Sequence, residues 1–208
     1  MRLWTIAILF AVTACTAQEG ASTVPEDAEP TLIDTLSQIP SGLVQLGQRN
    51  ASLTLTIFTN HHCRYCQEFH REQLPELVSA FVEPGDLHIV IGILPLRKYL
   101  GSDLAAKAII CSLRQGRGME MHDALFVGQS KTTDILLQEA AELELDLMLF
   151  EACLESPRTE HVYDDHNAWM QELEISQVPI FFLEGERLVG LQYIDDLKAK
   201  IESALRDL

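Results

Sequence analysis

Several short segments of the chain carry the hydrophobic pattern of β-strands. Residues 53–58 alternate leucine or isoleucine with threonine before a phenylalanine, and residues 87–94 are almost wholly apolar and β-branched. The first pattern predicts a β-strand, and the second predicts a strand that is buried on both faces of a sheet. Residues 43–46 predict a shorter edge strand, which turns at Arg49-Asn50.

A helix is predicted between the two longer strands. The apolar positions of residues 74–81 recur at helical spacing, so the helix should begin near Cys63 and end before Pro84-Gly85. Pro75 lies inside this segment and should kink the helix, because proline has no N–H to donate. Strand, helix and strand in this order predict a βαβ unit with a right-handed crossover.

The second half of the chain changes character twice. Residues 98–176 contain no convincing strand, and their apolar positions recur at helical spacing, which predicts an insertion of three to five helices. Residues 180–183 and 187–189 predict a β-hairpin, and residues 194–205 predict a final helix with one apolar face. With a short amphipathic segment at 32–39, the expected order is βαβ, a helical block and then ββα.

The first thirty residues have the pattern of an export signal followed by a tether. Arg2 precedes a run at residues 3–12 that is apolar but too short to span a bilayer. The Val-Thr-Ala-Cys sequence ending at Cys15 resembles the bacterial lipobox, in which the cysteine is lipidated and becomes the mature N-terminus. We expect a signal peptide at 1–14 and a lipidated Cys15 with a flexible tether over residues 15–30. Ordinary signal cleavage nearby is the alternative.

Composition narrows the function classes. The chain has 31 acidic and 15 basic residues and a formal net charge of -16, which disfavours binding to nucleic acid phosphates. Its hydrophobic content of 47% is ample for a packed core. Setting Cys15 aside leaves four of the five cysteines, an even number in an exported protein, where disulfides persist.

The sequence Cys63-Arg64-Tyr65-Cys66 follows a predicted strand and opens a predicted helix. Positions three apart share a helical face, so the two sulfur atoms can meet. Unpaired backbone N–H groups and the helix dipole favour a thiolate at Cys63, with His62, Arg64 and Tyr65 as candidates to tune it. A stabilised thiolate makes the corresponding disulfide more oxidising.

These motifs together resemble the DsbA-like thiol-disulfide oxidoreductases of the thioredoxin superfamily. The resemblance covers roughly residues 40 to 206 and includes Val178-Pro179 before the hairpin, as well as the stretches around Cys111 and Cys153. It implies an α/β thioredoxin fold whose two parts are separated by an inserted helical domain. The expected boundaries are 31–97 for the N-terminal part, 98–176 for the insertion and 177–208 for the C-terminal part.

The resemblance also implies roles for individual residues. Cys63 would be the nucleophile, Cys66 the buried resolving thiol, and Pro179 a cis-proline beside them. Val178 would present backbone groups to an extended substrate segment. Ile57 occupies the position at which relatives often have a buried acid.

The expected activity is exchange of a Cys63-Cys66 disulfide with exported proteins that contain cysteines, by a lipoprotein anchored in the bacterial periplasm. Valine before the proline is similar to the oxidase branch, so a disulfide-forming oxidase is favoured, with a reductase or isomerase as the alternative. The redox partner would be a quinone-linked membrane oxidase or a reducing membrane relay. No nucleotide, flavin or haem motif is evident, so no cofactor is expected.

Two other interpretations concern cysteines and histidines. Cys111 and Cys153 are favoured as a structural disulfide within the helical block, and two buried free thiols are the alternative. His61 and His62, together with Cys63 and Cys66, raise a copper- or zinc-handling lipoprotein as a different class of function. We assign no metal site, because neighbouring side chains on an extended segment diverge. A degenerate redox fold serving as a binding module is disfavoured by the intact cysteines.

Overall fold

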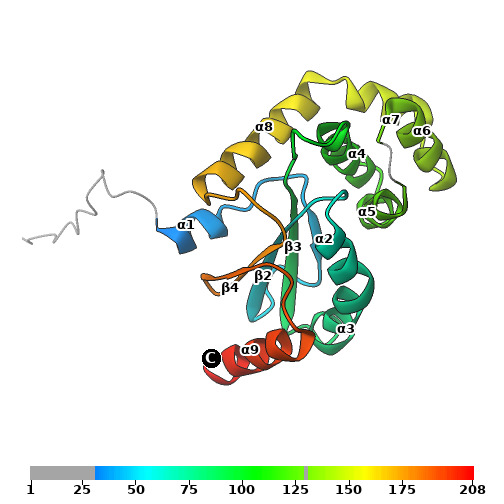
Figure 1. Ribbon diagram of the computed structural model, residues 1–208. Helices are drawn as coiled ribbons and strands as arrows, with labels where there is room; N and C mark the ends of the chain where they lie inside the picture. Colours follow the sequence, from blue (N-terminus) through cyan, green and yellow to red (C-terminus); the bar gives the residue numbers. More distant parts are fainter. Residues whose placement is uncertain (1–30, 129–130) are drawn as a thin grey trace, which may run out of the picture.

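A five-stranded mixed sheet forms the centre of the molecule (Figure 1). The computed structural model describes residues 31–128 and 131–208, so the predicted signal peptide, Cys15 and the whole predicted tether lie outside it. The strand order is β1-β3-β2-β4-β5, in which β2 and β3 are parallel and the other neighbours are antiparallel. The strands are β1 (Val44–Leu46), β2 (Leu53–Thr59), β3 (Leu87–Ile93), β4 (Ile180–Leu183) and β5 (Glu186–Val189). This topology confirms the expected thioredoxin fold, with β1 at one edge.

The connection between β2 and β3 is helical throughout but not uniform. The sequence predicts one helix kinked at Pro75, whereas the structure alternates between α- and π-helical turns. Pro75 lies in the first turn of α3, directly after a π-helical segment. A proline cannot complete the ordinary ladder of hydrogen bonds, so the change in winding falls next to it. The segments are α2 (Arg64–Glu68), η1 (Phe69–Gln73), α3 (Leu74–Leu77) and η2 (Val78–Val82).

The predicted helical block is present between β3 and β4, where the described residues form five helices, at the upper limit expected for it. They gather at one end of the sheet, and α8 returns along it toward β4 (Figure 1). In the parts of the chain that the structure describes, no helix is both long enough and apolar enough to cross a membrane. The helices are α4 (Ser102–Leu113), α5 (Gly118–Val127), α6 (Thr133–Glu142), α7 (Leu147–Leu154) and α8 (Pro157–Glu172).

The two faces of the sheet are packed by different helices. One face forms the larger core with α3, the helical block and α9 (Ile194–Arg206), whose Leu197 and Ile201 are fully buried. On the other face, Trp169 of α8 packs against Phe58 of β2, with ring centroids 5.1 Å apart. The short helix α1 (Leu32–Ser37) lies over this second face, where the Trp169 indole donates a hydrogen bond to the Thr35 carbonyl.

Candidate active site

The Cys63-Cys66 pair lies where β2 gives way to α2. Cys63 has extended backbone angles and is the N-cap residue of α2, and its sulfur accepts a hydrogen bond from the backbone N–H of Cys66 at 3.3 Å. Cys63 is partly exposed, whereas Cys66 is 1% exposed. Both are free thiols, so the structure holds the reduced form of the pair. One thiol can therefore be reached from solvent and the other cannot.

The two thiols are also electrostatically different. Hydrogen bonds from the Cys66 thiol and from the backbone N–H groups of Cys66 and Tyr65, together with the charge of Lys98, outweigh burial and lower the pKa of Cys63 to about 6. The pKa of Cys66 is raised, first by burial and then by its hydrogen bond to Cys63. Near neutral pH Cys63 is thus a thiolate and Cys66 a protonated thiol, which is the division expected of an attacking and a resolving cysteine.

The loop before β4 completes the surroundings of Cys63. The Val178–Pro179 peptide bond is cis, and the Cys63 sulfur lies 3.6 Å from the Val178 carbonyl oxygen, to which it can donate a hydrogen bond when Cys63 is protonated. This loop reaches the dithiol because β4 pairs antiparallel with β2, with Ile180 opposite Phe58. The structure thus brings together the four residues to which the resemblance gave the central roles.

Asn60 anchors the active-site turn, although the sequence analysis did not single it out. Its side-chain amide donates to the Leu94 carbonyl at 2.7 Å and to the Ser102 hydroxyl at 2.8 Å. Its side-chain oxygen accepts from the backbone N–H of His62 at 2.8 Å. An asparagine that follows a strand and bonds its own backbone two residues on is typical of an Asx turn, and this signal could have identified it.

The candidate tuning residues lie around Cys63 but act on it unequally. The His62 ring stacks on Tyr99, with centroids 4.8 Å apart, and the Arg64 guanidinium lies over the Tyr65 ring at 6.0 Å. Tyr65 affects the Cys63 pKa through its backbone N–H. The charge with the largest effect on that pKa belongs to Lys98, which comes from the loop after β3 and was not predicted. Because β2 and β3 are parallel, their carboxyl ends meet at one edge, a rule that points to this loop.

His61 points into a cluster of imidazoles instead of joining the cysteines. Its Nε2 lies 2.9 Å from His122 Nδ1 of α5, and His70 Nε2 lies 2.8 Å from a carboxylate oxygen of Asp123. Burial lowers the pKa of His61 well below its ordinary value and that of His122 to about 3, so both rings are neutral near pH 7. Across residues 31–128 and 131–208, no three or more His, Cys, Asp or Glu side chains are grouped to hold a metal ion.

The second cysteine pair is a disulfide between α4 and α7. The Cys111–Cys153 bond has an S–S distance of 2.08 Å and a Cα–Cα distance of 5.8 Å. Arg114 donates to the Cys153 sulfur at 3.0 Å and to the Thr159 hydroxyl at 2.8 Å. The sequence left a disulfide and two buried free thiols as alternatives, and the structure contains the disulfide.

Ile57 is a core residue beneath the active site. It is 1% exposed and lies between Ile91 of β3 and Phe181 of β4 in the sheet. An apolar side chain at this point supplies no carboxylate to assist proton transfer.

Several solved structures share this fold. BdbD from Bacillus subtilis, in its oxidised form, aligns with a TM-score of 0.71 and 22% identity, over 80% of this chain and 96% of BdbD. The protein alpha-DsbA1 from Wolbachia pipientis aligns with a TM-score of 0.71 and 18% identity, over 83% and 96% of the two chains. A thioredoxin-like oxidoreductase from Silicibacter pomeroyi DSS-3 aligns with a TM-score of 0.71 and 25% identity, over 83% and 97%.

The fold and the site define the class of protein, a thiol-disulfide oxidoreductase with a DsbA-like architecture. A sequence model of the family described as Thioredoxin matches residues 40–203. The chain belongs to this thioredoxin family.

The chain also matches part of a much longer curated protein. The Na(+)/H(+) antiporter NhaA 3 of Salinispora tropica is 30% identical over 168 residues, which cover 76% of this chain and 24% of the antiporter. The chain thus spans about a quarter of the length of the curated relative that it matches.

Proposed function

We propose that the protein forms disulfides in exported proteins, with Cys63 as the nucleophile and Cys66 as the resolving thiol. The observation that carries this proposal is the asymmetry of the pair. Cys63 caps α2, is partly exposed and has a pKa of about 6, whereas Cys66 is buried and protonated. We further propose that residues 98–176 are a domain inserted between the two parts of the thioredoxin fold, 31–97 and 177–208.

The proposed reaction is a two-step exchange of one disulfide. A substrate thiolate attacks Cys63 of the oxidised enzyme, forming a mixed disulfide and releasing Cys66 as a thiolate, which takes up a proton. A second substrate thiolate then attacks the substrate sulfur of the mixed disulfide and displaces the Cys63 thiolate. The substrate loses two electrons and two protons, and the enzyme gains two electrons as the reduced Cys63-Cys66 pair. The low pKa of Cys63 makes it a good leaving group in the second step.

Substrate binding is proposed at the Val178-Pro179 loop. The Val178 carbonyl lies 3.6 Å from the Cys63 sulfur, and a backbone group at this point can pair with an extended polypeptide whose cysteine reaches Cys63. Such recognition through the main chain tolerates many side chains, which suits an enzyme that acts on a range of exported proteins.

The stability of the reduced pair supports the oxidising direction. A thiolate that is stabilised by helix N–H groups and by Lys98 favours the dithiol over the disulfide, so the disulfide is a stronger oxidant. The deciding experiment is equilibration of the Cys63-Cys66 pair with glutathione. A reduction potential near about -120 mV supports the oxidase, whereas a value near about -270 mV identifies a reductase.

The proposed location is the periplasmic face of a bacterial membrane, with the chain anchored through lipidated Cys15. The support is the lipobox-like sequence and the composition of the tether. A quinone-linked membrane oxidase would then take the electrons from the reduced pair. Incorporation of labelled palmitate that disappears in Cys15→Ala supports the anchor, and equal labelling of the variant rejects it.

A further inference from the structure

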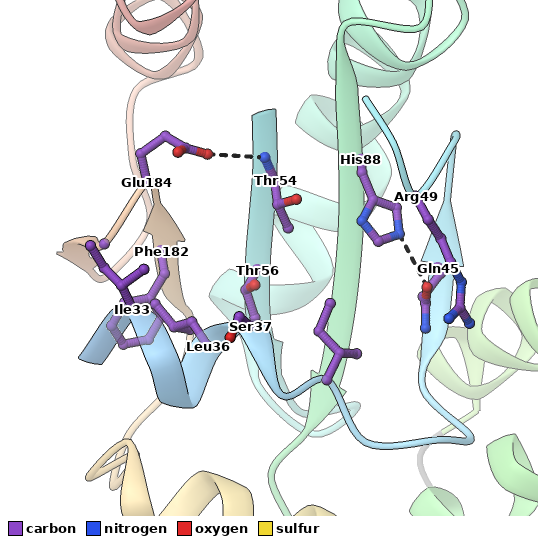
Figure 2. A pocket seen from close by; sticks show the side chains of 12 residues that line it. Ile33, Leu36, Ser37, Gln45, Arg49, Thr54, Thr56, His88, Phe182 and Glu184 are labelled. Atoms are coloured by element: carbon purple, nitrogen blue, oxygen red, sulfur yellow. Dashed lines mark hydrogen bonds between the residues drawn. The ribbon is translucent and has the colours of Figure 1, made fainter. Parts of the chain in front are cut away.

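A cavity lies on the face of the sheet that carries α1, and none of its lining residues belongs to the redox site (Figure 2). Its volume is about 360 Å³, at the small end of the range of ligand pockets. The floor is formed by the ends of β2 and β3 remote from Cys63, and α1 and the residues after it form one wall. This position separates the cavity from the thiol chemistry.

The cavity exists because this sheet face changes from apolar to polar along its strands. On β2 the side chains facing this way are Phe58, then Thr56, then Thr54. On β3, Val90 is followed toward the same end by His88. Helix α8 covers the apolar half of the face, and the six-residue helix α1 is too short to close the polar half.

Polar groups at the floor are available to a ligand. Thr56 and His88 are each 2% exposed. Figure 2 draws two hydrogen bonds here, from the Thr54 N–H to Glu184 and between His88 Nε2 and Gln45, and neither uses the Thr56 hydroxyl. Thr56 lines the cavity, and its hydroxyl can donate a hydrogen bond to a molecule bound there.

Charge distinguishes the two ends of the cavity. Arg49 lies beside His88 and Gln45, and it forms no ion pair within residues 31–128 or 131–208. Burial, and then the charge of Arg49, lower the pKa of His88, so the imidazole is neutral and Arg49 is the cation at this end. At the opposite end the Glu184 carboxylate repels anions. An anionic group is therefore favoured at Arg49.

The remaining wall is apolar. Ile33 and Leu36 of α1, Ile39 after it and Phe182 of β4 line the cavity between the two charged ends. Ile33 is 64% exposed, so a ligand bound against α1 would remove part of its apolar surface from water.

We propose that this cavity binds a small amphipathic anion, with a carboxylate at Arg49 and an apolar chain beneath α1. Burial of Ile33 and Leu36 against the chain supplies the hydrophobic contribution, and Arg49 with the Thr56 hydroxyl supplies polar selectivity. The site is independent of Cys63, so the proposal does not rest on the direction of the redox reaction.

The test is titration of the full chain with decanoate and with decanol, which differ in the charged group. Trp169 is a built-in reporter, because its indole donates to the Thr35 carbonyl of α1 at 2.8 Å. We expect a saturable change in tryptophan fluorescence with decanoate, and binding about fivefold weaker with decanol. The absence of saturable binding, or equal affinity for both molecules, overturns the proposal.

Three variants locate the binding. Arg49→Gln should reduce the affinity for decanoate about fivefold and leave the affinity for decanol unchanged. The control is Arg71→Gln, at an exposed side chain of η1, and it should alter neither affinity. Thr56→Leu should fill the cavity and abolish binding of both, with normal thiol exchange as the check on folding. Unchanged decanoate binding in Arg49→Gln or in Thr56→Leu contradicts the site.

Flotation with lipid vesicles distinguishes binding of a free ligand from binding to a membrane surface. The proposal is for a single free molecule, so flotation with phosphatidylglycerol vesicles should not depend on Arg49. Vesicle binding that is lost in Arg49→Gln, without saturable binding of monomeric decanoate, would assign the cation to lipid headgroups and overturn the proposal.

Discussion

The molecule contains two pairs of cysteines, and the two pairs differ in their chemical state. Cys63 and Cys66 are free thiols at the start of a helix, three positions apart. Cys111 and Cys153 are 42 positions apart, on two helices, and are joined by a disulfide. Each pair has one residue that is 1% exposed, Cys66 in the first and Cys111 in the second, so burial alone does not distinguish the pairs. What distinguishes the first pair is that backbone N–H groups are directed at the Cys63 sulfur.

The difference teaches that surroundings, not the presence of two thiols, determine what a cysteine pair does. At the redox pair, N–H groups and Lys98 stabilise a thiolate, so the reduced state is accessible and reactive. At the structural pair, the bond closes a long loop between packed helices, so its main effect is on the unfolded chain.

The largest effect is expected from Cys63→Ser, which should reduce thiol exchange to the uncatalysed rate. Serine keeps the size of the side chain but cannot form the mixed disulfide. Cys66→Ser should instead accumulate mixed disulfides, because the resolving thiol is missing. Oxidation of a two-cysteine peptide, with thiol-specific gel shifts, measures both. Catalytic turnover by Cys63→Ser would remove the assigned nucleophile.

Next in size is the loss of stability in the Cys111→Ala/Cys153→Ala double variant. The closed loop spans a sequence separation of 42, and the chain-entropy relation gives a loss of about 4 kcal/mol in the free energy of unfolding. Denaturant unfolding of the oxidised proteins measures it. Replacing both cysteines avoids leaving a single free thiol.

The same double variant should retain the pKa of Cys63 and the rate of thiol exchange under native conditions. The hydrogen bonds that shift this pKa come from Cys66 and Tyr65, which do not touch the disulfide. A changed Cys63 pKa in the folded double variant would mean that the two pairs are coupled, contrary to the comparison.

A third prediction concerns pH. Alkylation of Cys63 by iodoacetamide should rise through a midpoint of about pH 6 and level off above it, because the thiolate is the reactive form. Cys66 should not react in the folded protein. Cys66→Ala removes the largest cause of the lowered pKa, so the midpoint of Cys63 should move to higher pH. An unchanged midpoint in that variant contradicts the hydrogen bond.

The lowered pKa of Cys63 also predicts how the stability of the reduced protein depends on pH. The pKa of Cys63 is lower in the folded reduced protein than its ordinary value of 9.0, so the thiolate stabilises that state fully above pH 9. This contribution declines as the pH falls and is lost below about pH 6. The oxidised protein has no thiol here, so the stability of the reduced form relative to the oxidised form should increase from about pH 5 to about pH 8.

Much of the fold follows from local sequence patterns. The apolar alternation of residues 53–58 and the continuous run at 87–94 predict β2 and β3, because strand periodicity is a property of neighbouring residues. The helix opened by Cys63 and the helical block are predicted for the same reason. The π-helical turns beside Pro75 are not, since they depend on which hydrogen bonds remain when one donor is lost.

Residues from distant segments were harder to predict. Lys98 affects Cys63 because the loop after β3 ends beside α2, and His61 meets His122 across 61 positions of sequence. Neither contact has a local signature. Asn60 had one, in the turn that it caps, but its bonds to Leu94 and Ser102 require the folded sheet.

The smallest effect expected is that of Lys98→Gln, and it refines the comparison at the redox pair. Lys98 is exposed and contributes less to the lowered Cys63 pKa than the hydrogen bonds from Cys66 and Tyr65, so its removal should raise that pKa slightly and slow alkylation near pH 6 by less than about twofold. Because a charge in water is screened, the difference from wild type should vanish in about 1 M salt. The matched control is Lys200→Gln, whose ammonium pairs with Glu186 beside α9 and should leave alkylation unchanged. A Lys98 effect that persists in high salt would indicate a direct structural role for the loop in place of an electrostatic one.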